Sequence, residues 1–378
     1  MVEVCERPSV LAALVQRGEI STPALTIDLD VLERNLDRMA AYCRQHGLGL
    51  RPHTKTHKTP EVARMQLERG ACGLTVAKVG EAEVMASAAN AEILVAYPIF
   101  GPEKLRRLAA LAKSRSILIA LDNEVTAREV SRAASSQGST LGVLVEFDVG
   151  LGRCGLEPGA ACVDLAARIL EMPGVKFRGL MLYSGNIWGN EAERQQVTAQ
   201  VAEQVQRALQ AFAEAHMPVE IVSGGSTPGA FFSHQIPGLT EVRPGTYVYN
   251  DLNTYYQGVC RLEDCAARVV VTVVSTAVAA RAIIDAGSKT LSSDLLSSGP
   301  CEGYGYVVEA PDARLIKLNE EHGYLDISKS NHRFRVGEIL TLIPNHVCTS
   351  VNMHDDVFTF RNHELVGSWR VAARGKIR

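Results

Sequence analysis

The sequence has almost no excess charge of either sign and no long uninterrupted apolar run. Its 39 basic and 42 acidic residues leave a formal net charge of −3, so it offers no basic stripe for a phosphate backbone, which argues against nucleic-acid binding. The longest apolar run, residues 266–280, is broken by Arg268 and Thr272 and is too short to cross a bilayer. The first residues, which include Glu3, lack the charged-then-apolar layout of a signal peptide. We therefore expect neither a nucleic-acid nor a membrane partner.

The cysteines are not arranged as a disulfide scaffold. Nine of them are scattered through the 378 residues without short, regular spacings, and their number is odd. This usage is typical of a protein in the reducing cytosol, so we expect a cytoplasmic protein whose thiols are mostly free and buried. The 46% of hydrophobic residues and the length predict a globular protein of two or three domains.

Short apolar or β-branched runs alternate with longer segments of helical period up to about residue 255. This alternation is typical of parallel strands joined by crossover helices. Eight runs are predicted to be strands, at residues 48–52, 73–76, 93–96, 117–121, 142–147, 177–182, 219–222 and 240–243. Eight strand-then-helix units in roughly 200 residues favour a closed (β/α)8 TIM-type barrel, although an open doubly wound sheet has the same local pattern. We assign residues 22–255 to this α/β barrel domain.

The pattern changes after Tyr255, where little helical period remains. Further strands are predicted at residues 266–278, 281–286, 314–318, 338–343, 357–361 and 368–374. This part of the chain, residues 256–378, predicts a C-terminal antiparallel β domain. Residues 1–21 are expected to pack against one of the two domains, and we assign them to the β domain. No repeat or flexible linker is found, so the domains should be docked rather than tethered.

A dense group of cations and histidines follows the first predicted barrel strand, where residues 51–58 read Arg-Pro-His-Thr-Lys-Thr-His-Lys. A surface turn could hold them, because water screens their repulsion. Alternatively, neighbouring charges and partial burial lower the pKa of a lysine and leave an amine able to form a Schiff base. Lys55 is the candidate for that amine, with His53 as a second candidate catalytic residue, whereas Lys58 is expected to point toward solvent.

Glycines gather after three later strands. Gly150, Gly152 and Gly155 have the GxGxxG spacing of a dinucleotide-binding loop. Such a loop follows the first strand of an open fold, whereas these glycines follow the fifth predicted strand. They are better explained as bends that let Arg153 reach inward. The turns at residues 223–228 and 243–249 follow the seventh and eighth strands. Each could be a tight loop, but together they predict a phosphate site, which barrels of this kind commonly have at that position.

His346 and Cys348 follow a predicted strand of the β domain, and their spacing places both side chains on one face. Imidazole plus thiolate suits Zn²⁺, although a partly buried histidine beside a core cysteine has the same pattern. Two ligands do not close a structural site, so a metal bound here would need water or substrate to complete its shell.

Taken together, these segments resemble the D-threonine aldolase and D-serine dehydratase family, which are pyridoxal-phosphate (PLP) enzymes of the alanine-racemase-like fold type III. The resemblance covers nearly the whole chain and is carried by residues 51–58, 222–228, 241–247, 285–289, 320–323 and 344–348. It implies that PLP forms a Schiff base with Lys55, that Arg153 lies against the cofactor ring, and that Tyr183 is a catalytic residue bordering the same pocket. The remaining cofactor-binding candidates are Ser223, Gly224, Gly225, Ser226, Thr227, Gly245, Thr246 and Tyr247.

The resemblance also implies a divalent metal on His346 and Cys348, with Zn²⁺ favoured over Mn²⁺ by the thiolate. It implies a homodimer in which the β domain of one subunit completes the active site of the other. The expected activity is a lyase acting on D-3-hydroxy-α-amino acids, with retro-aldol cleavage to glycine and an aldehyde placed first. The alternative is β-elimination to a 2-oxo acid and ammonia, because a cysteine at position 348 is similar to the metal ligand of the dehydratase branch. An amino-acid racemase of the same fold would need no metal, so the pair of His346 and Cys348 argues against it. A non-catalytic PLP carrier would resemble only a lone barrel, so the additional β domain argues against that alternative.

Overall fold

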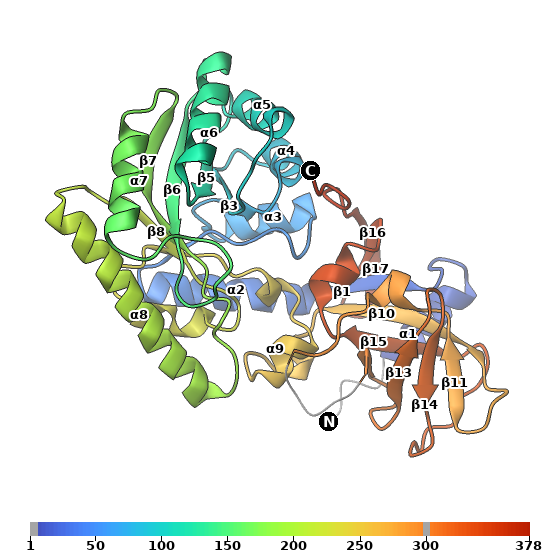
Figure 1. The fold of residues 1–378 in the computed structure, drawn as a ribbon. Helices are drawn as coiled ribbons and strands as arrows, with labels where there is room; N and C mark the ends of the chain where they lie inside the picture. The colour runs from blue at the N-terminus through green and yellow to red at the C-terminus, as the bar shows by residue number, and fades with distance from the viewer. Residues whose placement is uncertain (1–6, 298–302) are drawn as a thin grey trace. The chain divides into compact units, whose positions relative to one another are not determined.

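The structure is a computed structural model that describes residues 7–297 and 303–378 (Figure 1). The chain divides into two compact units, which we call the β unit and the barrel unit. The β unit comprises Met1–Leu36, Thr56–Thr59 and Thr246–Arg374, and the barrel unit comprises Asp37–Lys55, Pro60–Gly245 and Gly375–Arg378. Three segments of the predicted barrel domain, residues 22–36, 56–59 and 246–255, therefore group with the β unit, and residues 375–378 of the predicted β domain group with the barrel unit.

The barrel unit contains eight parallel strands in the order β2-β9-β8-β7-β6-β5-β4-β3. They are β2 (Gly49–Leu50), β3 (Leu74–Val76), β4 (Ile93–Val95), β5 (Ile117–Leu121), β6 (Leu141–Phe147), β7 (Val175–Leu182), β8 (Ile221–Gly224) and β9 (Glu241–Val242). The first and last strands of this order also meet, because the Thr75 amide donates to the Pro52 carbonyl at 2.9 Å and the Thr54 amide donates to the Thr75 carbonyl at 2.8 Å. The predicted closed (β/α)8 barrel is therefore confirmed, and the open sheet is excluded.

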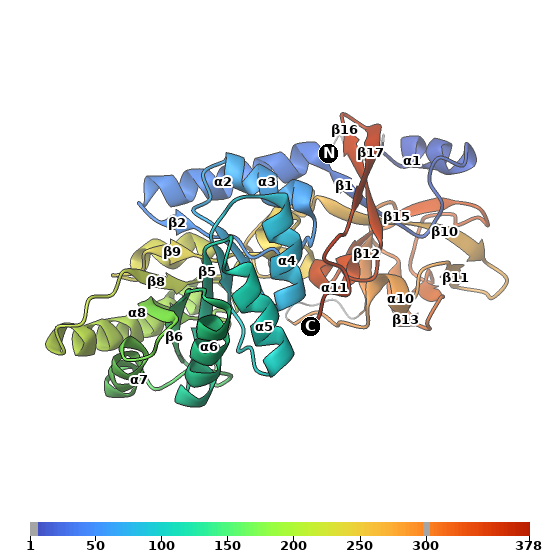
Figure 2. The ribbon, with the colours of Figure 1, turned by 90° about the horizontal axis from the view of Figure 1, so that it is seen from above.

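Helices cover the outside of these strands (Figure 2). They are α3 (Pro60–Glu68), α4 (Val79–Ala88), α5 (Pro102–Leu111), α6 (Glu124–Gln137), α7 (Ala160–Leu170) and α8 (Glu191–Glu214), while α2 (Leu29–Gln45) begins in the residues of the β unit. Local sequence sets their ends: the Asn123 side chain accepts from the Thr126 amide at the start of α6, and Gly138 ends that helix with a φ of 63°. Apolar side chains fill the barrel interior, including Leu94, Leu118 and Met181.

The β unit contains a nine-stranded sheet in the order β11-β14-β13-β12-β15-β10-β1-β16-β17. The strands are β1 (Ala24–Asp28), β10 (Ala267–Ser275), β11 (Arg281–Ile284), β12 (Gly305–Val307), β13 (Arg314–Leu318), β14 (Gly323–Asp326), β15 (Ile339–Pro344), β16 (Asp356–Arg361) and β17 (Glu364–Arg370). Strand β10 pairs with both β11 and β15, so six of the strands close into an antiparallel barrel. The predicted antiparallel β domain is confirmed, although β1, β12 and β14 were not predicted.

The N-terminal helix α1 (Arg7–Gln16) packs within the β unit, since Leu11 and Leu14 share an apolar cluster with Val270 and Ile339. Across the described ranges, no helix is both long and apolar enough to span a membrane.

None of the seven cysteines that the structure describes forms a disulfide, as predicted. However, only Cys43, Cys162 and Cys265 are buried, so the expectation of mostly buried thiols is wrong for these seven. Cys5 and Cys301 lie outside the described residues.

Candidate active site

The barrel unit has a cavity of about 310 Å³ at the carboxyl ends of its strands. Five residues of the predicted site line it: His53, Lys55, Arg153, Tyr183 and Gly225. They follow four different strands, β2, β6, β7 and β8, and meet because the carboxyl ends of parallel strands share one face of a barrel. The cavity is therefore assembled by the fold rather than by one local segment.

The segment that carries Lys55 is held on both sides. The His53 amide donates to the Pro244 carbonyl at 3.0 Å, and the Thr54 amide donates to the Thr75 carbonyl at 2.8 Å. The Lys55 amine lies 5.9 Å from the centre of the Tyr183 ring, and no hydrogen bond or ion pair of this amine is found among residues 7–297 and 303–378. A primary amine without an ion pair inside a cavity is suited to attack a carbonyl carbon.

Lys58 does not behave as expected. It is only 7% exposed and has a φ of 54°, and its carbonyl accepts from the Ala373 amide at 3.0 Å within the β unit. The chain turns before α3 begins at Pro60, so Lys58 does not follow the helix toward solvent. The prediction of an exposed Lys58 is wrong.

The loop after β6 brings Arg153 against Tyr183. The guanidinium carbon lies 4.5 Å from the centre of the Tyr183 ring, which is a cation–π contact. Gly150, Gly152 and Gly155 all have positive φ values in this loop, and a Cβ on Gly155 would lie 2.5 Å from the Phe147 carbonyl carbon. These glycines therefore bend the chain around Arg153, as the sequence interpretation expected.

Two charged residues of the cavity wall were not among the predicted site residues. Arg243 follows β9 and donates to the Ser223 hydroxyl at 2.8 Å and to the Leu182 carbonyl at 2.7 Å. Burial lowers the pKa of Arg243 to about 10, so the guanidinium remains charged at neutral pH. Glu146 lies near the end of β6, and burial raises the pKa of its carboxyl although the charge of Arg243 opposes the shift. A charged residue inside the otherwise apolar strand Leu141–Phe147 was the signal that could have revealed Glu146.

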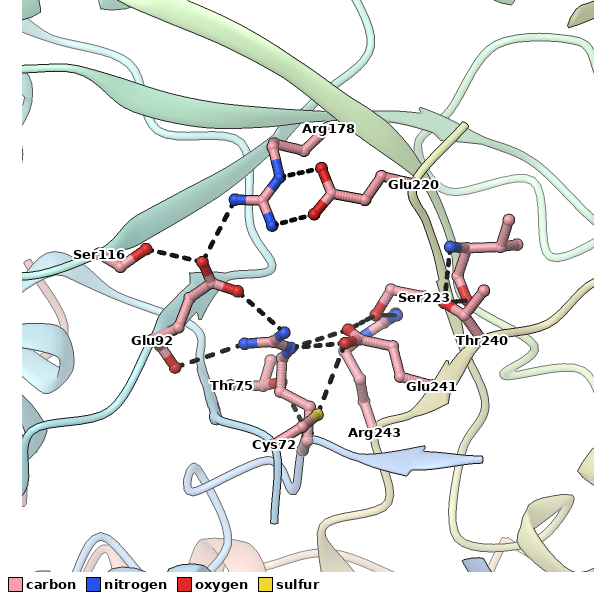
Figure 3. Close-up of polar contacts among 12 residues, drawn as sticks. Cys72, Thr75, Glu92, Ser116, Arg178, Glu220, Ser223, Thr240, Glu241 and Arg243 are labelled. Carbon is pink, nitrogen blue, oxygen red and sulfur yellow. Dashed lines mark hydrogen bonds and ion pairs between the residues drawn. The ribbon is translucent and has the colours of Figure 1, made fainter. Parts of the chain in front are cut away.

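A network of buried charges continues from Arg243 through the barrel unit (Figure 3). Arg51 donates from Nε to both carboxylate oxygens of Glu241, at 2.8 and 2.9 Å, and from Nη2 to Glu92 at 3.1 Å. The Ser223 hydroxyl donates to Glu241 at 2.5 Å. Burial alone would raise the pKa of Glu241, but the hydrogen bonds and charge of Arg51 outweigh it and lower that pKa. The Ser223 hydroxyl, predicted to bind cofactor, is thus engaged by Glu241 and Arg243.

The two glycine-rich turns lie together at the ends of β8 and β9, because the Gly245 amide donates to the Thr227 hydroxyl at 3.2 Å. Gly225 has a φ of 87°, a conformation that side chains rarely adopt, and lines the cavity. Gly224 is packed instead, since a Cβ there would lie 2.8 Å from a methyl group of Leu239.

Hydroxyl groups that suit an anion lie in the turn after β8, which contains Ser226, and in the loop after β7, which contains Ser184. The Ser226 hydroxyl donates to the Ser184 carbonyl at 3.0 Å. Among the described residues, the Ser184 hydroxyl is buried without a hydrogen-bond partner, as expected for a group that binds a ligand. Thr246 and Tyr247 belong to the β unit, where Tyr247 is buried. The residues of the barrel unit therefore fit a phosphorylated aldehyde, with an amine, a cationic wall and a glycine turn around one cavity.

His346 and Cys348 are brought together in the β unit, but not as two residues of a strand. β15 ends at Pro344, His346 precedes the short helix α11 (Val347–Val351), and Cys348 lies in its first turn, so the same-face argument was wrong. Their side chains nevertheless hydrogen-bond, and this contact, more than any other, raises the pKa of His346 to about 9. The Cys348 thiol donates to the Thr56 hydroxyl at 3.2 Å.

The donor chemistry of this pair fits a metal, since imidazole and thiolate are ligands of Zn²⁺. Within residues 7–297 and 303–378, no cluster of three or more His, Cys, Asp or Glu side chains could hold an ion. An ion at His346 and Cys348 would therefore take its remaining ligands from water or substrate.

Comparisons with known proteins agree with this geometry. Residues 27–253 match the family model described as alanine racemase, N-terminal domain, and residues 266–360 match the putative serine dehydratase domain. The chain is 33% identical to D-threonine aldolase of Arthrobacter sp, covering 95% of this chain and 94% of that protein. It is also 33% identical to D-threo-3-hydroxyaspartate dehydratase of Delftia sp. (strain HT23), covering 88% and 92%. The crystal structure of D-threonine aldolase from Filomicrobium marinum superposes with a TM-score of 0.88 at 32% identity, covering 95% of this chain and 97% of that one.

Proposed function

The chain belongs to the D-threonine aldolase and D-serine dehydratase family of PLP-dependent lyases, and on this premise we propose that it cleaves D-3-hydroxy-α-amino acids to glycine and an aldehyde. The observation that carries the proposal is the cavity in which the Lys55 amine, Arg153 and Tyr183 meet beside the Gly225 turn. When bound, PLP supplies an electron sink for the electron pair left at Cα.

We assign the parts of this cavity as follows. The Lys55 amine would hold the cofactor covalently, and Arg153 and Tyr183, which line the same cavity, would bind it noncovalently. The turns after β8 and β9, together with the Ser184 hydroxyl from the loop after β7, would receive the phosphate, which backbone N–H groups and hydroxyls bind well. The assignment of Lys55 is tested below by substitution.

His53 is the group we assign to proton transfer. Its Nδ1 lies 3.4 Å from the Lys55 amide, so the ring is oriented by the backbone that carries the amine. In retro-aldol cleavage the β-hydroxyl loses its proton, the Cα–Cβ bond breaks, and Cα takes up a proton to give glycine. An imidazole can serve both proton transfers near neutral pH.

A divalent ion on His346 and Cys348, with Zn²⁺ favoured, would act as a Lewis acid on the β-hydroxyl oxygen. Because the chain offers two ligands there, the oxygen of a substrate can complete the shell. We further propose that the protein is a homodimer, which analytical ultracentrifugation can test.

Dehydration is the second candidate reaction, and the specific observation that favours it is the cysteine at position 348, beside His346. In that reaction Cα loses its proton, the β-hydroxyl leaves as water, and hydrolysis gives a 2-oxo acid and ammonia. The relative from Delftia is named as a dehydratase of this kind.

Product analysis separates the candidates. The protein would be incubated with D-threonine, D-serine and D-threo-3-hydroxyaspartate. Glycine with an aldehyde supports the proposal, a 2-oxo acid with ammonia supports dehydration, and the L-enantiomer would identify a racemase. In parallel, Lys55→Ala should lose the visible absorption band of the bound cofactor, whereas Lys113→Ala, an exposed control on the same unit, should keep it. A Lys55→Ala variant that retains the band and the activity contradicts the assignment.

A further inference from the structure

We propose that Asp294 is a positioning residue for the metal ion, acting through the ligand His346. This inference rests on the proposed metal site at His346 and Cys348. Asp294 lies between α10 (Ser288–Leu291) and β12, more than fifty residues before the ligand pair, and all three residues belong to the β unit. Its carboxylate oxygen Oδ2 lies 2.7 Å from Nδ1 of His346.

Asp294 is itself fixed by residues on both sides of His346. The Asn345 side chain donates to the Asp294 carbonyl at 3.0 Å, and the Thr349 hydroxyl donates to Oδ2 at 3.0 Å. Asn345 also donates to the Gly303 carbonyl at 2.8 Å. The carboxylate is therefore held in one place by the same segment that carries the two ligands, so the imidazole meets a fixed acceptor.

This contact decides which ring nitrogen is available. An ionised carboxylate only accepts hydrogen bonds, so the shared proton resides on Nδ1 and the lone pair of the neutral ring is on Nε2. A metal ion needs that lone pair. A carboxylate on the far nitrogen orients a ligating histidine and makes it a stronger ligand.

The geometry favours positioning over direct ligation by Asp294. Its Oδ2 accepts from both Nδ1 of His346 and the Thr349 hydroxyl, on the side of the ring away from Nε2. The side chains of His346 and Asp294 are 38% and 41% exposed, so neither is sealed from solvent or from an ion that arrives through it.

The experiment measures Zn²⁺ affinity of the PLP-loaded protein by competition with a chromophoric chelator. Asp294→Ala should weaken Zn²⁺ binding about 10- to 100-fold, in the range seen when such outer partners are removed. Asp294→Asn keeps an oxygen that can accept from Nδ1 and should recover part of the affinity. The visible absorption of the cofactor should not change in either variant.

Two further variants calibrate the result. Cys348→Ala removes a ligand and sets the loss expected for direct coordination. Asp312→Asn removes another carboxylate of the β unit, which binds Ser330 and Asn331, and should leave Zn²⁺ affinity unchanged.

The outcomes distinguish positioning by Asp294 from direct ligation by Asp294 and from the absence of a metal site. Unchanged Zn²⁺ affinity in Asp294→Ala overturns the inference while leaving the metal site intact. A loss as large as that of Cys348→Ala, without recovery in Asp294→Asn, overturns it in favour of direct ligation. Failure of the unsubstituted protein to bind Zn²⁺ would reject the proposed metal site itself, and the inference with it. If Asp294→Ala does not fold, the comparison is made with Asp294→Asn, for which a smaller but measurable loss is required.

Discussion

Replacing Arg51 with methionine should destabilise the barrel unit far more than removing an arginine from its surface. The side chains of Arg51 and Glu241 are only 4% and 6% exposed, and the guanidinium contacts both carboxylate oxygens of its partner. Truncating one member of such a buried pair leaves the other charge uncompensated, which costs about 3–5 kcal/mol. In the variant, Glu241 keeps the hydrogen bond from the Ser223 hydroxyl and the nearby charge of Arg243. We therefore expect the free energy of unfolding to fall by about 3 kcal/mol, at the lower end of that range.

The loss should depend on pH, with a sign that follows from the pKa of Glu241. Because that pKa is lowered in the folded protein, the pair contributes stability above the ordinary value of 4.5 and loses it as the pH falls through the lowered value. Without Arg51, the largest of the causes that lower the pKa of Glu241 is gone, so that pKa should rise and the carboxyl should become neutral more readily. The difference between the two proteins should therefore be largest near neutral pH and shrink in acid.

Urea unfolding of the cofactor-free proteins, followed by circular dichroism, measures this difference. The matched control is Arg106→Met, which removes an exposed arginine paired with Glu103 three residues away and should leave the free energy of unfolding nearly unchanged, because water screens the pair. The double variant Arg51→Met/Glu241→Leu removes both charges and should recover part of the loss. A cost below about 1 kcal/mol for Arg51→Met would refute the reasoning.

Three further outcomes follow from the same structure. Gly179→Ala should prevent stable folding, because a Cβ there would lie 2.0 Å from the Ile221 carbonyl oxygen. Expression level and thermal melting measure the effect, and the control is Gly18→Ala, whose added Cβ would have no atom within 4 Å. Glu146→Gln should raise the melting temperature at pH 8. Because the pKa of Glu146 is raised in the folded protein, its ionised carboxylate destabilises the fold at pH values above the ordinary pKa of a glutamate. The gain in melting temperature should therefore vanish at pH 4, where the carboxyl is neutral in the folded protein. Removing bound metal with a chelator should abolish turnover and leave the visible absorption of the cofactor unchanged, whereas full activity after complete metal removal would contradict the Lewis-acid role.

The barrel could be predicted because most of its strands carry a strong local signal. A parallel strand inside a barrel is buried on both faces and reads as an apolar run, as in β5 and β6. The strands that were missed lack such a signal. β12 has three residues, β14 includes a glycine and an aspartate, and the place of β1 depends on pairing with β10, more than 240 residues away.

The site residues likewise divide into those with a local sequence signal, which were predicted, and those without one, which were missed. Lys55 and Arg153 stood out because unusual residues cluster around them, and both line the cavity. Arg243 and Glu146 each carry a single charge in ordinary surroundings, and their importance depends on burial beside one another. His346 and Cys348 were expected to meet as two residues of one strand, but sequence alone did not reveal that α11 begins between them.

The buried charges connect barrel closure to the cavity wall. Arg51 lies at the end of β2, where the barrel closes, and pairs with Glu241 of β9, which accepts from the Ser223 hydroxyl of β8. Ser223 in turn accepts from Arg243, whose side chain lines the cavity that contains Lys55. Since a guanidinium is held by the acceptors around it, the position of Arg243 depends on Glu241 remaining ionised and in place. Removing Arg51 should therefore alter the electrostatics around Lys55 as well as stability, although no atom of Arg51 needs to reach the substrate.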